Sequence, residues 1–125
     1  MQEFLSDEKS IYLQISERIE TDILRGILLE EERVPSKNEL AVIYTINPAT
    51  AGKGVTILAD EGILYKKRGI GMFVAEGARA KILEKRRKQF EEKSIREVLR
   101  EAKHLGINTE ELIDMIRKAD RNEQV

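Results

Sequence analysis

Two helix starts lie 11 residues apart in this 125-residue chain, and they constrain its fold more than any other feature. Ser36 and Glu39 have the spacing of a capping box, in which each side chain binds a backbone N–H near the other. Asn47 is a favourable N-cap, and Pro48 suits the first helical position because its missing N–H costs nothing there. The sequence therefore predicts two short helices joined by a tight turn, the second ending at Gly62.

An amphipathic helix is predicted before this pair. Ser10 is a candidate cap, and Gly26 is a candidate stop because glycine enters the left-handed region without steric cost. Between them, isoleucines recur at helical spacing: Ile11, Ile15, Ile19 and Ile23. The acidic run Glu30–Glu32 that follows is predicted to be a loop lying away from any polyanion.

Two glycines, Gly52 and Gly54, fall inside the third predicted helix. Each costs about 1 kcal/mol relative to Ala in a helix interior. Either tertiary packing holds this helix together, or the glycines permit close approach of a partner's backbone. The sequence leaves both interpretations open.

A β-hairpin is predicted next. Residues 63–67 and 72–74 are rich in strand formers, and the turn between them, residues 68–71, carries two glycines. Three helices followed by a hairpin form the layout of a winged helix-turn-helix, so the predicted fold class is mostly α with a small β-hairpin. We expect this domain over residues 10–77, followed by a short helical dimerisation tail over residues 78–125.

The tail contains two apolar stripes whose helical phase shifts between Phe90 and Ile95. A helix break near Ser94 and one long helix are both consistent with this pattern. Leu105–Ile107 forms a stop, and Asn108 begins a final helix. Short amphipathic helices have no independent core of useful size, so we expect them to be buried against a twofold partner. The predicted dimer interface consists of Phe90, Ile95, Val98, Leu99, Leu112 and Ile116.

Charge is unevenly distributed along a chain whose formal net charge is only −1. Residues 1–63 hold 6 basic and 12 acidic groups, residues 64–103 hold 13 and 6, and residues 104–125 hold 3 and 5. A neutral total argues against a nucleic-acid partner, whereas the positive block can act as a local field. The absence of Cys and of a long apolar run excludes disulfides and predicts a cytoplasmic protein without a membrane span.

Three spaced motifs resemble the DNA-binding domain of GntR-family bacterial transcription regulators: the Ser10–Ile15 run, the Val34–Ala41 box and the Gly62–Val74 segment. Ile46–Ala51, Leu64–Val74 and the tail segment Ala102–Gly106 resemble the YtrA-like subfamily in particular. The resemblance implies a homodimeric repressor that binds double-stranded operator DNA, with a palindromic operator expected from twofold symmetry. Other subfamilies carry large effector domains, for which the residues after Gly77 are too few, and the sequence does not indicate a small-molecule effector.

The candidate DNA contacts come from three places. A recognition helix enters the major groove N-terminus first, and a preceding helix N-terminus favours a phosphate. A basic hairpin tip suits the narrow minor groove. The predicted DNA-binding residues are Ser36, Lys37 and Asn38 on the second helix, Asn47, Ala49, Thr50 and Lys53 on the third, and Lys66, Lys67, Arg68, Gly69 and Gly71 on the hairpin. The family often has basic residues in place of Asn38 and Gly52, so the predicted surface has lost positive charge.

Several of these residues also have a purely structural interpretation. Asn47 and Thr50 have the chemistry of helix caps, and Lys53 suits a solvated position. The basic stretch over residues 79–88 suits a solvated face slightly better than phosphate contact. The alternative function is a winged-helix protein-interaction module without specific DNA binding. No nucleophile–base pair, paired carboxylates or metal-ligand spacing occurs, so neither an enzyme nor a metal or cofactor site is predicted, and the single histidine, His104, is interpreted as structural or solvated.

Overall fold

The computed structural model describes Leu5 and residues 9–123. The chain divides into two compact units, one up to Glu84 and one from Lys85 onward. None of the helices in the described part of the chain is long and apolar enough to cross a membrane.

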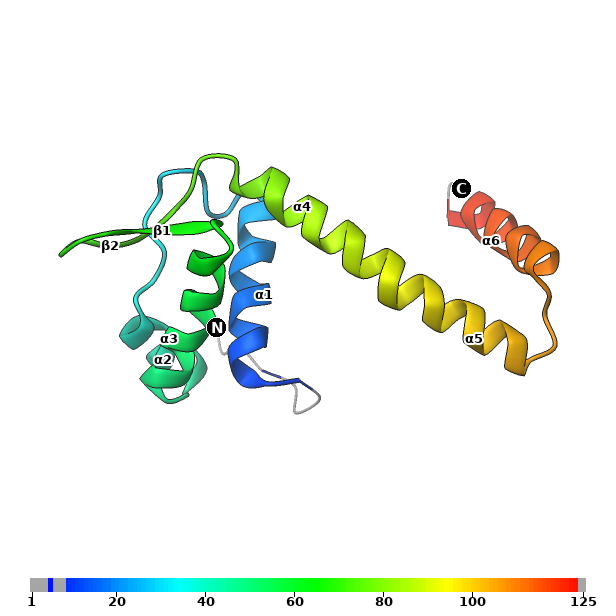
Figure 1. Cartoon of the computed structure of the whole chain (residues 1–125), viewed down its shortest axis with the longest axis horizontal. Helices are drawn as coiled ribbons and strands as arrows, with labels where there is room; N and C mark the ends of the chain where they lie inside the picture. The colour runs from blue at the N-terminus through cyan, green and yellow to red at the C-terminus, as the bar shows by residue number, and fades with distance from the viewer. Residues whose placement is uncertain (1–4, 6–8, 124–125) are drawn as a thin grey trace. The chain divides into compact units, whose positions relative to one another are not determined.

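Three helices build the first unit: α1 (Ile11–Leu24), α2 (Lys37–Tyr44) and α3 (Pro48–Asp60). All three were predicted from capping and periodicity, and the predicted ends are confirmed. The Ser10 side chain is an exception, because it makes no capping hydrogen bond although α1 begins directly after it. α1 and α2 both pack against α3 (Figure 1).

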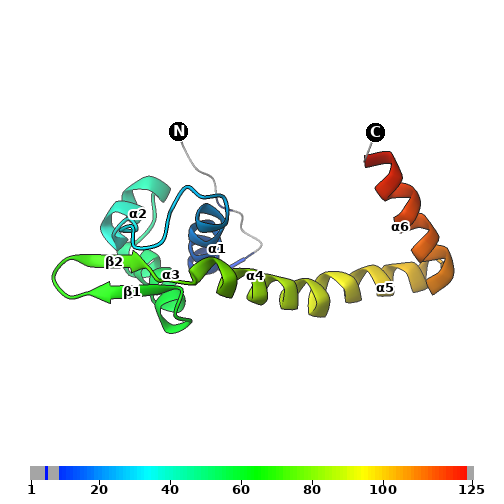
Figure 2. The same ribbon diagram turned by 90° about the horizontal axis from the view of Figure 1, so that it is seen from above.

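The predicted hairpin is confirmed as β1 (Leu64–Lys67) and β2 (Gly71–Val74), paired antiparallel from Leu64↔Val74 to Lys67↔Gly71 (Figure 2). We call residues 64–74 the wing. A cross-strand aromatic pair, Tyr65 and Phe73, has its ring centroids 6.1 Å apart.

A third extended segment lies along β2, and the sequence reasoning missed it. The Glu31 N–H donates to the Val74 carbonyl over 2.8 Å, and the Val74 N–H donates to the Glu32 carbonyl over 2.9 Å. Arg33 continues this pairing as an isolated bridge to Phe73. Glu30 and Glu31 form a turn, as predicted for the acidic run, and Glu31 has φ +68°, so the extended part that was missed follows them.

One apolar core holds the first unit together. It takes side chains from the three helices, the segments before α2 and before the wing, the wing itself and the start of α4: Ile15, Ile19, Ile23, Val34, Leu40, Ala51, Val55, Leu58, Ile63, Leu64, Val74, Ala78 and Ile82. Ala78 and Ile82 belong to the predicted tail, and both are 0% exposed. The first turns of that helix therefore complete the core of the first unit.

Helical turns continue from α4 (Ala78–Gln89) through a π-helical segment, η1 (Phe90–Ile95), into α5 (Arg96–His104). The helix therefore does not break at Ser94. The phase shift in the sequence is instead taken up by η1. A π turn holds about one residue more than an α turn. Phe90 and Ile95, five positions apart, therefore lie close to the same side of the helix, whereas in an α-helix they would lie about 140° apart.

The second unit closes with α6 (Thr109–Glu123). Gly106 has φ +72° and ends α5, and Asn108 caps α6: its Oδ1 accepts from the Glu111 N–H over 2.9 Å. An apolar groove of about 360 Å³ lies between α5 and α6 and is lined by Ala102 and Met115 among others. Ala102 is the one buried residue among residues 85–123, so this unit has almost no core of its own.

Candidate nucleic-acid interface

The start of α2 presents the first group of predicted contacts. The capping box is present, with the Glu39 N–H donating to Ser36 Oγ over 3.1 Å and the Ser36 N–H donating to Glu39 Oε1 over 3.0 Å. Lys37 and Asn38 are exposed on the first turn. The bland interpretation of Ser36 as a cap is therefore correct, and its neighbours carry the outward-facing polar groups.

Arg33 ties this helix start to the wing. Its Nη2 lies 2.8 Å from Glu39 Oε1, and its side chain covers Gly71, where a Cβ would meet Arg33 Nε at 3.2 Å. The hydrogen bond from the Ser36 N–H, followed by that from Arg33, holds the pKa of Glu39 below its ordinary value. Sequence reasoning missed Arg33, although an isolated basic residue directly after three glutamates was a usable signal.

The start of α3 carries the second group. Asn47 Oδ1 accepts from the Ala49 N–H over 2.8 Å, so Asn47 is a helix cap. Ala49 is exposed, and Thr50 is half-buried. Because Pro48 fills the first helical position, the small residue Ala49 and the hydroxyl of Thr50 form the leading edge of this helix.

Lys53 is exposed one turn further along α3. Its ammonium lies 4.0 Å from the ring centroid of Tyr12 on α1, in the geometry of a cation–π contact. The bland interpretation of Lys53 as a freely solvated residue is therefore incomplete. Sequence reasoning did not single out Tyr12 as a site residue.

The two interior glycines of α3 have separate roles. A Cβ at Gly54 would meet the Tyr12 carbonyl oxygen at 2.6 Å, so Gly54 permits the close packing of α1 on α3. A Cβ at Gly52 would meet only the flexible stem of Lys37, at 3.3 Å from its Cδ. Lys37 therefore lies beside Gly52. The contact at Gly54 confirms that tertiary packing against α1 holds this helix, whereas close approach of a partner's backbone stays a prediction.

The wing carries the third group at its turn. The Ile70 N–H donates to the Lys67 carbonyl over 2.9 Å, and Gly69 has φ +77°, which closes a tight turn. Lys66, Arg68 and Gly69 are exposed. In both views the turn extends beyond α2 and α3 (Figures 1 and 2).

Lys67 differs from its two basic neighbours. Its ammonium lies 4.2 Å from the ring centroid of Phe73, and the residue is half-buried. On the same face the Tyr65 hydroxyl donates to Glu31, a hydrogen bond that raises the pKa of Tyr65. The side chains on one face of the wing thus stabilise it through contacts within the first unit, while Lys66 and Arg68 supply its exposed positive charge.

The glutamates of the acidic run accept hydrogen bonds from other parts of the chain. Glu30 Oε1 accepts from the Gly77 N–H over 2.9 Å, and Glu32 Oε1 accepts from the Leu29 N–H over 2.7 Å. In the basic stretch after the wing, Lys81 donates to the Gly62 carbonyl at the end of α3 over 3.1 Å. At least one of those cations therefore has a structural role.

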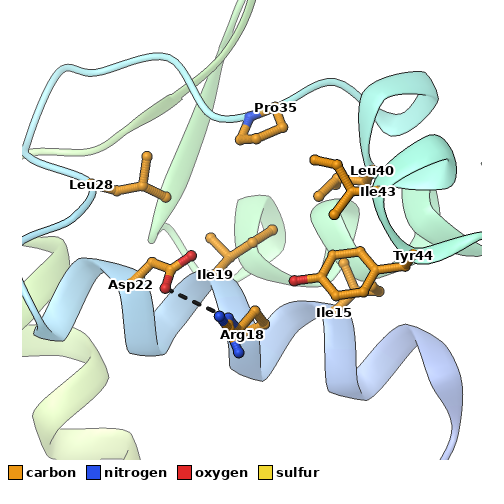
Figure 3. A pocket seen from close by; sticks show the side chains of 9 residues that line it. All are labelled: Ile15, Arg18, Ile19, Asp22, Leu28, Pro35, Leu40, Ile43 and Tyr44. Atoms are coloured by element: carbon orange, nitrogen blue, oxygen red, sulfur yellow. Dashed lines mark ion pairs between the residues drawn. The ribbon is translucent and has the colours of Figure 1, made fainter. Parts of the chain in front are cut away.

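A small apolar hollow of about 160 Å³ lies between α1, α2 and the segment that joins them (Figure 3). Ile19, Leu40 and Tyr44 line it, and at its edge the Arg18 Nε lies 3.7 Å from Asp22 Oδ1. None of the predicted contact residues lines this hollow. Within the described residues no cluster of three potential metal-binding His, Cys, Asp or Glu side chains occurs.

Most residues of the predicted dimer interface carry exposed apolar surface in the single chain. Phe90 is 59% exposed and Ile116 is 56% exposed. Ile95, Val98 and Leu99 are also exposed, and Leu112 is half-buried in the groove between α5 and α6. Such surface is unusual on a chain that acts alone.

Comparison with known proteins agrees with this geometry. The model of the family described as bacterial regulatory proteins, gntR family, matches residues 11–74. The HTH-type transcriptional repressor YtrA of Bacillus subtilis is 31% identical over 108 residues, which cover 86% of this chain and 82% of YtrA.

Two solved structures extend the likeness. The crystal structure of a putative transcriptional regulator of GntR family from Bacteroides thetaiotaomicron has a TM-score of 0.75 and 38% identity, covering 90% of this chain and 98% of that one. AraR(DBD) in complex with operator ORX1 has a TM-score of 0.51 and 33% identity over 60% of this chain and 92% of that chain. The family match spans α1 to the end of the wing, and the likeness to YtrA extends through most of the second unit. The chain belongs to the gntR family of bacterial regulatory proteins.

Proposed function

We propose that this protein is a sequence-specific DNA-binding transcriptional repressor that acts as a homodimer on a palindromic operator in the cytoplasm. The observation that carries this proposal is an exposed basic side chain on each of α2, α3 and the turn of the wing. Lys37, Lys53 and Arg68 are exposed on these three elements. The similar domain AraR(DBD) is in complex with an operator, which supports the same use of this fold.

The three elements suit different parts of a duplex. A helix start with free N–H groups favours a phosphate, which we assign to α2 with Ser36 and Lys37. A helix that enters the major groove by its N-terminus presents small and polar residues to base edges, which fits Ala49 and Thr50 on α3. The exposed Arg68 at a glycine turn fits the minor groove beside it.

The second unit is assigned to dimerisation. Its apolar residues are mostly exposed, and only Ala102 is buried among residues 85–123. A twofold copy would cover the apolar faces of α5 and α6, and it would place two wings and two α3 helices on related half-sites. This arrangement supports a palindromic operator.

Footprinting of the purified protein on the DNA upstream of its own gene tests the proposal. We expect a protected palindrome whose affinity falls as salt rises, since the phosphate contacts release counterions. Absence of any protected segment at low salt would refute it and would favour a protein-interaction module.

Arg68→Ala and Lys53→Ala test the assigned contacts. Both side chains are exposed, so we expect weaker binding to the protected sequence with unchanged thermal stability. Lys118→Ala, on the exposed face of α6, is a matched control that should bind normally. Normal affinity and an unchanged salt slope in both test variants would contradict the assignment.

A further inference from the structure

The first turn of α1 is fixed directly against α3. Gly54 allows the Tyr12 carbonyl to approach so closely that a Cβ there would lie 2.6 Å from its oxygen. The Ser16 hydroxyl lies 2.6 Å from the Gly54 carbonyl oxygen and 3.3 Å from the Tyr12 carbonyl oxygen, so a buried hydrogen bond joins the two helices at the same point. The backbone of Tyr12 therefore has little freedom to move relative to α3.

The ring of Tyr12 meets the ammonium of Lys53 at 4.0 Å from its centroid. On α3 the flanking residues Gly52 and Gly54 have no side chain, and Ala49, one turn before Lys53, has only a methyl group. Among the described residues no carboxylate forms an ion pair with Lys53. The Tyr12 ring is thus the contact that selects one direction for a long and flexible side chain.

We propose that Tyr12 is a positioning residue for sequence readout: its ring holds the Lys53 ammonium so that it donates to one base edge of the operator. This inference rests on the proposed function. Ordering a lysine side chain has an entropic cost, and a partner that orders it in the free protein removes part of that cost from binding. A lysine aimed at one place discriminates between base pairs, whereas a mobile lysine reaches any nearby phosphate.

The test uses the full chain and a duplex selected by it from a random-sequence DNA library. Affinities are measured for that duplex and for its single-base-pair variants. The proteins compared are the parent, Tyr12→Phe, Tyr12→Leu, Lys53→Met and the double variant, with thermal melting to verify that each is folded. A cation–π contact at an exposed site corresponds to roughly a two- to fivefold change in affinity.

We expect Tyr12→Phe to bind like the parent and Tyr12→Leu to lose roughly that factor. Tyr12→Leu should have no further effect in the Lys53→Met background, and both variants should lose discrimination at the same base pair. Lys66→Met is the matched control, because Lys66 lies on the wing. In the Lys66→Met background Tyr12→Leu should lower the affinity by the same factor as in the parent. Losses that add in the Lys53→Met background, or unchanged discrimination, would overturn the inference.

A second measurement does not require DNA. Because the ring lies over the ammonium, the ε-methylene protons of Lys53 should be shifted upfield in the parent and in Tyr12→Phe, and should return to ordinary values in Tyr12→Leu. Ordinary values in the parent would overturn the positioning role. A parent protein that selects no sequence would overturn the proposed function, and this inference with it, whereas additive losses on a selected duplex overturn the inference alone.

Discussion

Gly52 and Gly54 of α3 differ in what an added Cβ would contact. At Gly54 a methyl group would meet backbone, the Tyr12 carbonyl oxygen at 2.6 Å, which cannot move without separating α1 from α3. At Gly52 it would meet the Lys37 stem at 3.3 Å, which can rotate away. Both positions lie inside the helix, so at both of them alanine has a higher helix propensity than glycine.

We therefore expect opposite effects of the same substitution at these two sites. Gly54→Ala should destabilise the protein by about 1–3 kcal/mol, as overpacking does. Gly52→Ala should be neutral or stabilise it by up to about 1 kcal/mol through helix propensity. Urea unfolding monitored by circular dichroism measures both. Equal effects would contradict the close contact assigned to Gly54.

The capping box at α2 gives a pH dependence. The pKa of Glu39 is lowered in the folded protein, so its ionised form contributes stability that is present above the ordinary value of 4.5 and is lost as pH falls below it. Glu39→Gln removes this titration. We expect the parent to melt above the variant near neutral pH, and the difference to shrink as pH falls below about 4.5. A difference independent of pH would refute the role of the charge.

At the scale of helices and strands, the sequence predicted the elements whose ends carry specific chemistry. Ser36, Asn47 and Asn108 cap helices as expected, and the turn glycines define the wing. The extended segment at Arg33 was missed because its identity depends on pairing with β2, a contact between residues far apart in the chain. The positions of Lys53 and Lys37 were likewise beyond prediction, since each is set by a neighbouring helix.

The π-helical segment η1 was visible in the sequence only as an unexplained change of phase. Our interpretation is that it accommodates one extra residue while keeping Phe90 on the side of Ile95. Phe90 and Ile95 would become i and i+4 neighbours if one residue between them were removed, and these share a face in an ordinary α-helix.

A single deletion tests this interpretation. Deleting Glu92 should convert η1 to ordinary α turns, keep the apolar face continuous and leave the proposed dimer intact in sedimentation. Deleting Arg100, an exposed residue in the α turns of α5, is the matched control: it rotates all following residues by about 100° and should weaken the dimer. Dissociation on deletion of Glu92 would show that the π turn itself is required.

For the whole molecule, net charge is a poor guide and its distribution a good one. The total of −1 argues against a nucleic-acid partner, yet the match to the gntR family confirms the resemblance read from the motifs. The acidic groups of the first half are partly used in hydrogen bonds, such as those of Glu30 and Glu32 to backbone N–H groups. Lys66 and Arg68 of the wing remain exposed.

Truncation separates the two units. A chain ending at Glu84 keeps the complete core of the first unit and should be a folded monomer by sedimentation and thermal melting. A chain ending at Gly77 lacks Ile82, and loss of a buried side chain of this size costs about 2–5 kcal/mol, so it should melt at a lower temperature. A dimeric chain ending at Glu84 would exclude the second unit as the principal interface.

The burial of Ala78 and Ile82 also bears on how such regulators diversify. The family match and the wing both end at Val74. The sequence motifs alone therefore suggest that the chain could be joined to a different carboxyl-terminal region directly after the wing. Such a joint would destabilise the first unit, because it would replace Ala78 and Ile82 of its core by residues that pack in another protein. Lineages that trade their carboxyl-terminal regions should therefore keep the first turns of α4 with the wing, so that the inherited module is longer than the shared motif.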